Sequence, residues 1–158
     1  GGGDHERPLL ERGLNDARRL GAYIAEHHLI PDFAAVSDAR RTRETWDALS
    51  ENWPHRLPVR IEPRLYEASV ANLLTLLRQS PDDMRSMMSV GHNPGFVDLA
   101  LQLIGYGDRY ASQRLRAKFP TCSMIVLDFD VDSWSQVAPH TARLDRFITP
   151  KSLGGEDD

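Results

Sequence analysis

The chain has 158 residues, a formal net charge of −4, and a composition that is 41% hydrophobic and 27% charged. This length and balance predict one soluble domain with a sizeable core. No apolar run approaches the length of a membrane span, and the slightly acidic balance argues against nucleic acid as a partner. The single cysteine, Cys122, cannot form an internal disulfide and indicates a reducing compartment, for which we expect the cytoplasm. Paired cysteines and His-x-x-x-His are absent from the sequence, so we expect neither a metal nor another cofactor.

Apolar spacing predicts helices and strands that alternate along the chain. Helices are expected over residues 10–27, 40–51, 70–77 and 96–104, and strands over 33–37, 59–62, 84–90 and 123–129, with a closing strand pair at 134–138 and 141–147. This alternation predicts an α/β fold, a three-layer sandwich with a mainly parallel central sheet and helices on both faces. Residues 1–153 are expected to form a single domain, and residues 154–158 a loose acidic tail.

Charged residues cluster where the strand at 33–37 runs into the helix at 40–51. Three arginines lie within four residues of a chain whose net charge is negative, and this indicates an anion-binding site. Arg41 and Thr45 share a helix face, four residues apart. Arginine offers a planar fork for phosphate oxygens that lysine cannot copy. The alternative is a solvated helix face with Arg40 or Arg43 paired to Glu44, and we expect it to hold for two of the three arginines.

A second junction of this kind follows the strand at 84–90, where the chain reads Gly91-His92-Asn93-Pro94. Pro94 suits the first position of a helix, where its missing N–H is not needed. Ligands bind at the carboxyl edge of open α/β sheets, and a helix N-terminus there favours anions. His92 is therefore a candidate contact for phosphate or carboxylate, and a buried or capping histidine is the alternative. Asn93 either contacts phosphate, orients His92 or stabilises the turn.

These segments together resemble a known family. The spacing Ser37-x-x-x-Arg41-x-x-x-Thr45, followed by the glycine-histidine turn at 91–95, is similar to the histidine phosphatase superfamily, and most of all to the small SixA-type phosphohistidine phosphatases. Residues 4–13, 65–69 and 146–150 resemble further segments of that group, so the resemblance covers nearly the whole chain. It implies a phosphoglycerate mutase-like fold.

The activity that the resemblance implies is hydrolysis of phosphohistidine on a phosphotransfer protein, through a covalent phosphohistidine enzyme intermediate and without a metal. His92, Arg41 and Glu67 are then catalytic, Glu67 as a candidate proton donor. Arg41, His92, Asn93 and Ser37 bind phosphate, with Ser37 bracing the Arg41 loop. Two alternatives stay open: a phosphatase of a small phosphoester, and a phosphate-binding regulatory protein without turnover. Larger relatives that act on metabolites carry lid insertions. Here the only spare lengths are residues 67–84 and 105–118, so a shallow site would suit a protein substrate.

One departure from the family pattern concerns the nucleophile. The family carries an Arg-His pair at the end of its first strand, and this histidine is phosphorylated; the given sequence contains no such strand. His5 does not replace it, because His5 lies in a polar loop with no apolar strand before it. The helix at 10–27 also lacks the preceding strand that an α/β layer needs. We therefore expect an apolar strand with an Arg-His pair upstream of Gly3 in the natural protein, in the middle of the sheet beside the strands that end at Ser37 and Val90. The alternative is a natural chain without this strand, which would be a binding protein that lacks the nucleophile.

Overall fold

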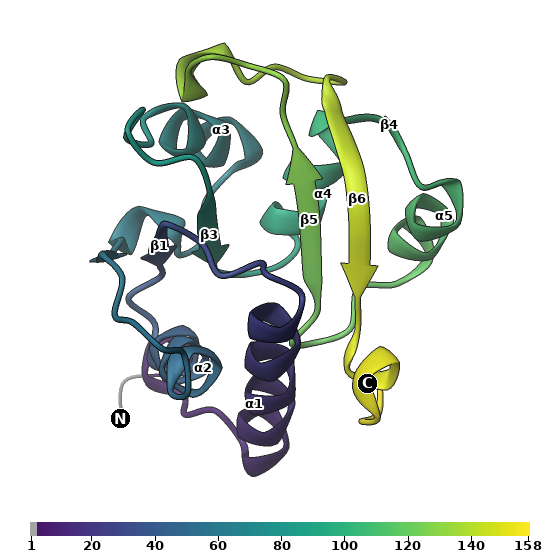
Figure 1. The fold of residues 1–158 in the computed structure, drawn as a ribbon. Helices are drawn as coiled ribbons and strands as arrows, with labels where there is room; N and C mark the ends of the chain where they lie inside the picture. Colours follow the sequence, from purple (N-terminus) through teal and green to yellow (C-terminus); the bar gives the residue numbers. More distant parts are fainter. Residues whose placement is uncertain (1–2) are drawn as a thin grey trace.

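The protein is described by a computed structural model, which places residues 3–158 (Figure 1). Helices and strands alternate through most of its length. In chain order they are α1 (Glu11–Glu26), β1 (Phe33–Val36), α2 (Arg40–Ser50), β2 (Val59–Ile61), α3 (Val70–Arg78), β3 (Met87–Val90), α4 (Gly95–Leu103), β4 (Ile104–Gly107), α5 (Arg109–Ala117), β5 (Met124–Asp128) and β6 (Ala142–Ile148). Short 3-10 helices lie at η1 (Gly3–Glu6), η2 (Pro63–Leu65), η3 (Trp134–Gln136) and η4 (Pro150–Leu153).

The strands form two three-stranded sheets. The first has the order β2-β1-β3 and is parallel throughout, with Ala34 opposite Val59 on one side and Met88 on the other. The second has the order β4-β6-β5, in which β4 runs parallel to β6 and β5 runs antiparallel to it. The predicted α/β class with a largely parallel sheet is confirmed, but the sheet is divided into two halves.

The two halves leave a gap between β3 and β5. Among the described residues, β3 pairs with β1 alone and β5 pairs with β6 alone, so each strand has one unpaired edge. A cavity of about 1110 Å³ lies here, and both strands line it together with apolar side chains such as Leu20, Leu99 and Leu103. All four residues of β3 are only half-buried, whereas strands inside a parallel sheet are normally buried on both faces.

Helices cover both faces of this divided sheet, as predicted. Helices α1 and α2 pack on one face around Leu20, Ile24 and Trp46, with Met88 of β3 and Met124 of β5 against them. Helices α3, α4 and α5 lie on the other face, in two further clusters centred on Leu103 and on Leu144. The result is a three-layer arrangement in which parallel strands connect through helices, as the sequence pattern requires.

Helices α1 and α2 approach each other so closely that the contact requires a glycine. A Cβ atom at Gly21 would lie 2.0 Å from the backbone oxygen of Leu49. The indole N–H of Trp53 donates a 2.9 Å hydrogen bond to the Gly21 oxygen, which fixes the turn after α2 against the middle of α1. This contact holds α2 in place at its C-terminal end. The N-terminal end of α2 carries the charged side chains of residues 40–44.

Three local predictions are wrong. Residues 134–138 were expected as a strand, but Trp134–Gln136 form a 3-10 helix with a capping box at Ser133. Residues 105–118, expected as spare length, contain most of β4 and all of α5. The chain end is not loose, because Asp157 accepts hydrogen bonds from Thr149 and Lys151, and Asp158 accepts from Thr121.

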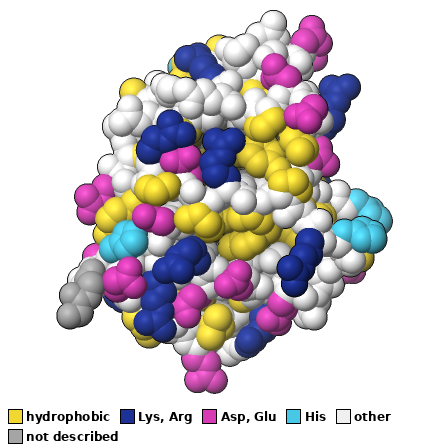
Figure 2. Space-filling view, turned by 90° about the vertical axis from the view of Figure 1, so that its left-hand side faces the viewer, with side chains coloured by type: hydrophobic (Ala, Val, Ile, Leu, Met, Phe, Trp, Pro, Cys, Tyr) yellow, Lys and Arg dark blue, Asp and Glu magenta, His cyan; other side chains and the backbone are white. Residues whose placement is uncertain are grey.

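The outer strand β2 presents apolar side chains to solvent. Val59 is 40% exposed and Ile61 is 47% exposed. The side of the molecule on which β2 lies in Figure 1 shows a band of hydrophobic side chains across its middle, bordered by charged ones (Figure 2). No helix formed by residues 3–158 has both the length and the hydropathy needed to cross a bilayer.

Candidate functional site: an arginine–histidine pocket

The junction between β1 and α2 is tied together by buried hydroxyl groups. The Ser37 N–H donates to the Val90 oxygen at 2.9 Å, which continues the pairing of β1 with β3 beyond the strand end. The Thr42 hydroxyl lies within hydrogen-bonding distance of two carbonyl oxygens, those of Ser37 (2.9 Å) and Ala39 (2.8 Å). Ser37 and Thr42 are both buried. These bonds fix the first turn of α2, and with it the direction in which Arg41 leaves the helix.

The junction between β3 and α4 is shaped by close packing. A Cβ atom at Gly91 would lie 2.3 Å from the Phe96 ring, so this ring can cover the turn only because residue 91 is glycine. The Phe96 N–H donates to the His92 oxygen at 3.1 Å, and α4 begins at Gly95 with Pro94 as its N-cap. Pro94 was predicted one position further into the helix. The turn carries His92 toward the β1–α2 junction.

His92 links the two junctions. Its Nδ1 lies 3.2 Å from Arg41 Nη2, and its Nε2 lies 2.7 Å from Ser37 Oγ. A guanidinium can only donate, so Nδ1 accepts and the ring proton sits on Nε2, from which it donates to Ser37. The pKa of His92 is lowered from its ordinary value, first by burial and second by the positive charge of Arg41. The structure therefore holds a neutral imidazole of defined tautomer beside the arginine.

Asp4 holds the other side of Arg41. The Arg41 Nη1 donates to the Asp4 backbone oxygen at 2.8 Å, and Nη2 lies 3.2 Å from the Asp4 Oδ2 atom. The Tyr66 hydroxyl donates to the same Oδ2 at 2.6 Å. The pKa of Asp4 is lowered, mainly by this bond from Tyr66 and further by Arg41, and the pKa of Tyr66 is raised by the same bond.

Tyr66 also lies between two histidines. Its ring meets His92 edge-on with centroids 5.2 Å apart, and it meets His5 edge-on at 5.0 Å. His5 Nε2 is 3.0 Å from Asp38 Oδ1, and His5 Nδ1 is 3.1 Å from Glu6 Oε1. The neighbouring Asp38 carboxylate is the largest cause of the raised pKa of His5. The opening segment thus forms one side of the site, and the sequence reasoning assigned no role in the site to Asp4, His5 or Tyr66.

Arg41, His92 and Tyr66 border a pocket of about 430 Å³. Four of the five predicted site residues line it: Arg41, Glu67, His92 and Asn93. The fifth, Ser37, does not line the pocket, but its hydroxyl contacts His92, which does. Glu67 and Asn93 are exposed. Glu67 has a φ of 54°, a left-handed backbone that is uncommon for a glutamate.

Two helices begin at the pocket wall. Ser69 and Val70 at the start of α3 line it, as do Pro94 and Gly95 at the start of α4. Ser69 is the predicted N-cap of α3, and its hydroxyl accepts from the Asn72 N–H at 3.2 Å. Helix N-termini carry partial positive charge and attract anions. The pocket therefore combines Arg41, His92 and two helix dipoles, an arrangement that suits a phosphoryl group.

The neighbouring arginines do not reach this pocket. Arg40 pairs with Glu44 at 3.3 Å, and the Arg43 Nε donates to the Asp38 oxygen at 3.1 Å. The expectation that two of the three arginines would have ordinary surface roles is confirmed. Arg41 is the member of the cluster that faces His92.

Similarity to known proteins agrees with this geometry. A model of the histidine phosphatase superfamily, branch 1, matches residues 1–89, more than half of the chain. An uncharacterized protein of Mycobacterium tuberculosis is 30% identical over 150 residues, which cover 94% of this chain and 92% of that protein. The chain belongs to the histidine phosphatase superfamily. The phosphatase class of activity that the sequence resemblance implied follows from this membership.

Solved structures match over almost the whole chain. A candidate phosphohistidine phosphatase SixA from Nakamurella multipartitia superposes with a TM-score of 0.82 at 26% identity, covering 95% of this chain and 88% of that chain. A second, from Agrobacterium tumefaciens, superposes with a TM-score of 0.78 at 27% identity and the same two coverages. The predicted SixA-type resemblance and the phosphoglycerate mutase-like fold class are confirmed.

Proposed function

We propose that this protein is a phosphohistidine phosphatase that acts on a phosphotransfer protein. The observation that carries the proposal is the Arg41–His92 contact in a pocket where α3 and α4 begin. A phosphoryl group in transfer spreads its charge over three equatorial oxygens, so catalysis is mostly positioning and electrostatic stabilisation. The likeness to two candidate SixA proteins at 26% and 27% identity supports the phosphohistidine substrate.

Each predicted site residue receives a role in this proposal. Arg41 binds the phosphoryl oxygens through its guanidinium, and Asn93 adds an amide at the pocket wall. His92 takes up a proton when the anion enters, because the added negative charge opposes the effect of Arg41 on its pKa. Ser37 fixes the His92 ring from behind. Glu67 relays a proton from solvent to the departing imidazole of the substrate and returns to its ionised form.

The covalent route also needs an attacking histidine. Of the two histidines described at the site, neither His92 nor His5 is placed for this role. His92 contacts Arg41 and Ser37 through its two ring nitrogens, and His5 contacts Asp38 and Glu6. An attacking imidazole needs one nitrogen lone pair directed at phosphorus. We assign the nucleophile to an Arg-His pair on a further apolar strand.

We propose that this strand pairs in the gap between β3 and β5. Within residues 3–158 the facing edges of β3 and β5 have no strand partner, so they offer backbone donors and acceptors, and the cavity between them is lined by apolar side chains. A strand that ran parallel to β3 would bring its carboxyl end next to the turn that carries His92. Its histidine would attack phosphorus and break the P–N bond of the substrate. Water would then release phosphate from the enzyme and regenerate the histidine.

Complementation by a peptide tests this assignment. The 158-residue chain is mixed with a synthetic apolar peptide that ends in Arg-His, and phosphate release from a phosphohistidine protein is measured in excess chelator. We expect release with this peptide and none with the matched Arg-Ala peptide. Turnover by the chain alone would show that the nucleophile assignment is wrong. Loss of activity in chelator, with recovery in magnesium, would contradict a metal-independent reaction.

A binding protein without turnover is the second candidate. It is favoured by the same observation that both histidines of the site are held through both ring nitrogens. The two candidates give different results with the natural polypeptide, whose mass is first compared with that of the 158-residue chain. Phosphate binding together with phosphohistidine hydrolysis supports the enzyme, and binding without hydrolysis supports the regulatory protein. A small phosphoester as substrate is separated from phosphohistidine by their relative kcat/KM values.

A further inference from the structure

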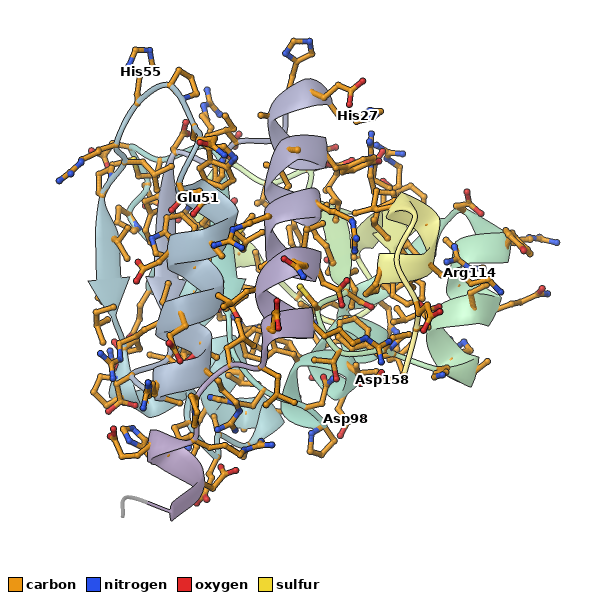
Figure 3. The ribbon with its side chains drawn as sticks, turned by 90° about the horizontal axis from the view of Figure 1, so that it is seen from below. His27, Glu51, His55, Asp98, Arg114 and Asp158 are labelled. Carbon is orange, nitrogen blue, oxygen red and sulfur yellow. The ribbon has the colours of Figure 1, made fainter. Side chains whose placement is uncertain are left out.

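The outer part of the Arg41–His92 pocket is acidic. Asp4, Glu67 and Asp98 all line it, and all three are exposed. Among the described residues that line this pocket, Arg41 is the single lysine or arginine. Asp98 projects from the first turn of α4, on the same side of the molecule as η1, which carries Asp4 (Figure 3). Three carboxylates thus accompany one guanidinium.

Asp4 differs from the other two carboxylates because it contacts the phosphate-binding group directly. Its carboxylate and its backbone oxygen both accept from Arg41, and Tyr66 holds the carboxylate in place. Its lowered pKa keeps the carboxylate ionised at neutral pH. The guanidinium charge is therefore already balanced by Asp4 before any ligand binds. Arg41 keeps further N–H donors for an anion, and more attraction comes from the starts of α3 and α4 and from the arginine of the proposed Arg-His pair.

We infer that Asp4 is a specificity-determining residue, which makes the site prefer phosphoryl groups whose attached group is positively charged. Glu67 and Asp98 support it in this role. This inference rests on the proposed phosphate site. It adds that the group attached to the phosphoryl group carries positive charge. A phosphoryl group in the pocket directs its attached group toward the exposed side. There a cation is attracted by the carboxylates, whereas a second anion is repelled.

The inference distinguishes the two substrate classes that the sequence leaves open. The imidazole of phosphohistidine becomes cationic when it is protonated, and a protein can add basic side chains beside it. A small phosphoester that carries a carboxylate or a second phosphate brings a further negative charge to the same carboxylates. The acidic wall therefore favours the N-linked phosphoryl group over anionic metabolites.

A matched pair of ligands tests this preference without turnover. The probes are 2-aminoethylphosphonate and 3-phosphonopropionate, which share a two-carbon arm and differ in the charge at its end. Affinities are measured by calorimetry at low salt, with inorganic phosphate as the reference. We expect the wild-type chain to bind the amine about tenfold more tightly than the carboxylate. This ratio should decrease as salt is added, since the carboxylates are exposed.

Substitution of Asp4 supplies the second arm of the test. Asp4→Asn keeps the shape of the side chain and removes its charge, so the ratio between the two probes should fall several-fold. Asp130→Asn is the matched control, because Asp130 is exposed and does not line the pocket. Urea unfolding of each variant shows whether the fold is kept, and Glu67→Gln offers a second removal of charge from the same wall.

Each outcome separates the inference from the proposed function. Equal binding of the two probes by wild type would overturn the charge preference, and so would an unchanged ratio in Asp4→Asn. In both cases, retained binding of inorganic phosphate would leave the phosphate site intact. A wild-type chain that binds no inorganic phosphate would count against the proposed function itself.

Discussion

The two strand-to-helix junctions that build the site are stabilised in different ways. The β1–α2 junction is held by two buried hydroxyls: that of Ser37 accepts from the Ala39 N–H, and that of Thr42 donates to backbone oxygens of the same turn. The β3–α4 junction instead depends on the absence of side chains at Gly91 and Gly95, where the Phe96 ring and the Ala68 oxygen pack closely. Arg41 comes from the first junction and His92 from the second, so the 3.2 Å contact between them requires both.

The largest effect is expected from the first junction, through the charged group that it presents. Arg41→Ala should weaken binding of inorganic phosphate by about 1.5–3 kcal/mol for each charge-assisted hydrogen bond lost. Titration calorimetry with phosphate or vanadate measures this loss. Arg40→Ala is the matched control, because Arg40 pairs with Glu44 on the exposed side of α2. Equal affinity in wild type and Arg41→Ala would remove Arg41 from the phosphate site.

The second junction should respond to a single added methyl group. Gly91→Ala places a Cβ atom 2.3 Å from the Phe96 ring, so overpacking should lower the free energy of unfolding by about 1–3 kcal/mol. Urea denaturation measures the change. When Phe96 is already replaced by alanine, Gly91→Ala should lower the free energy of unfolding by less, because the ring that the new methyl group would meet is gone. Additive effects of the two substitutions would show that the fit at this turn is not the cause.

The smallest effect concerns pH, where the two histidines beside Tyr66 act in opposite directions. The pKa of His92 is lowered from 6.5, mainly by burial. Its contribution to stability is therefore present above pH 6.5 and is lost as the pH falls from there through the folded pKa. The pKa of His5 is raised from 6.5 by Asp38, so its contribution is present below pH 6.5 and is lost as the pH rises through the folded pKa.

Ring-proton resonances followed against pH measure both values. The midpoint of His92 should lie below 6.5 and that of His5 above it. In Arg41→Ala the His92 midpoint should move upward, because the neighbouring positive charge is removed. Coincident titration of the two rings in wild type would contradict the contacts that we describe for them.

Local patterns were sufficient to predict most elements and the central pair of the site. The apolar periodicity of α1 and α2, the short apolar runs of β1 and β3, and the Ser69 cap all act within a few residues of chain. Strand β4 was missed because it begins directly after α4, at Ile104, with no turn residue between them. Helix α5 is short and mostly polar, and it is stabilised by Leu115 packing against the second sheet. Such packing leaves little trace in a local pattern.

The same limit explains which site residues were missed. Asp4 contacts two residues that are distant in the sequence: Arg41 lies 37 positions away and Tyr66 lies 62 positions away. Neither residue has an unusual local setting, and an aspartate in a polar opening segment usually faces solvent. The motif Leu65-Tyr66-Glu67 directed attention to the glutamate, although the tyrosine makes the closer contacts. The sequence offered one signal: a partly buried arginine needs an acidic residue that offsets its charge, and Asp4 is a candidate for this.

The gap between β3 and β5 also has a consequence for how this polypeptide behaves in concentrated solution. An unpaired strand edge presents a row of backbone donors and acceptors that other chains can join, and natural sheets usually protect such edges. Here two edges face one cavity, and the charged side chains that normally discourage pairing are absent from residues 87–90 of β3. We therefore expect intermolecular strand pairing, and from it concentration-dependent aggregation, to involve β3 as well as the exposed outer strand β2.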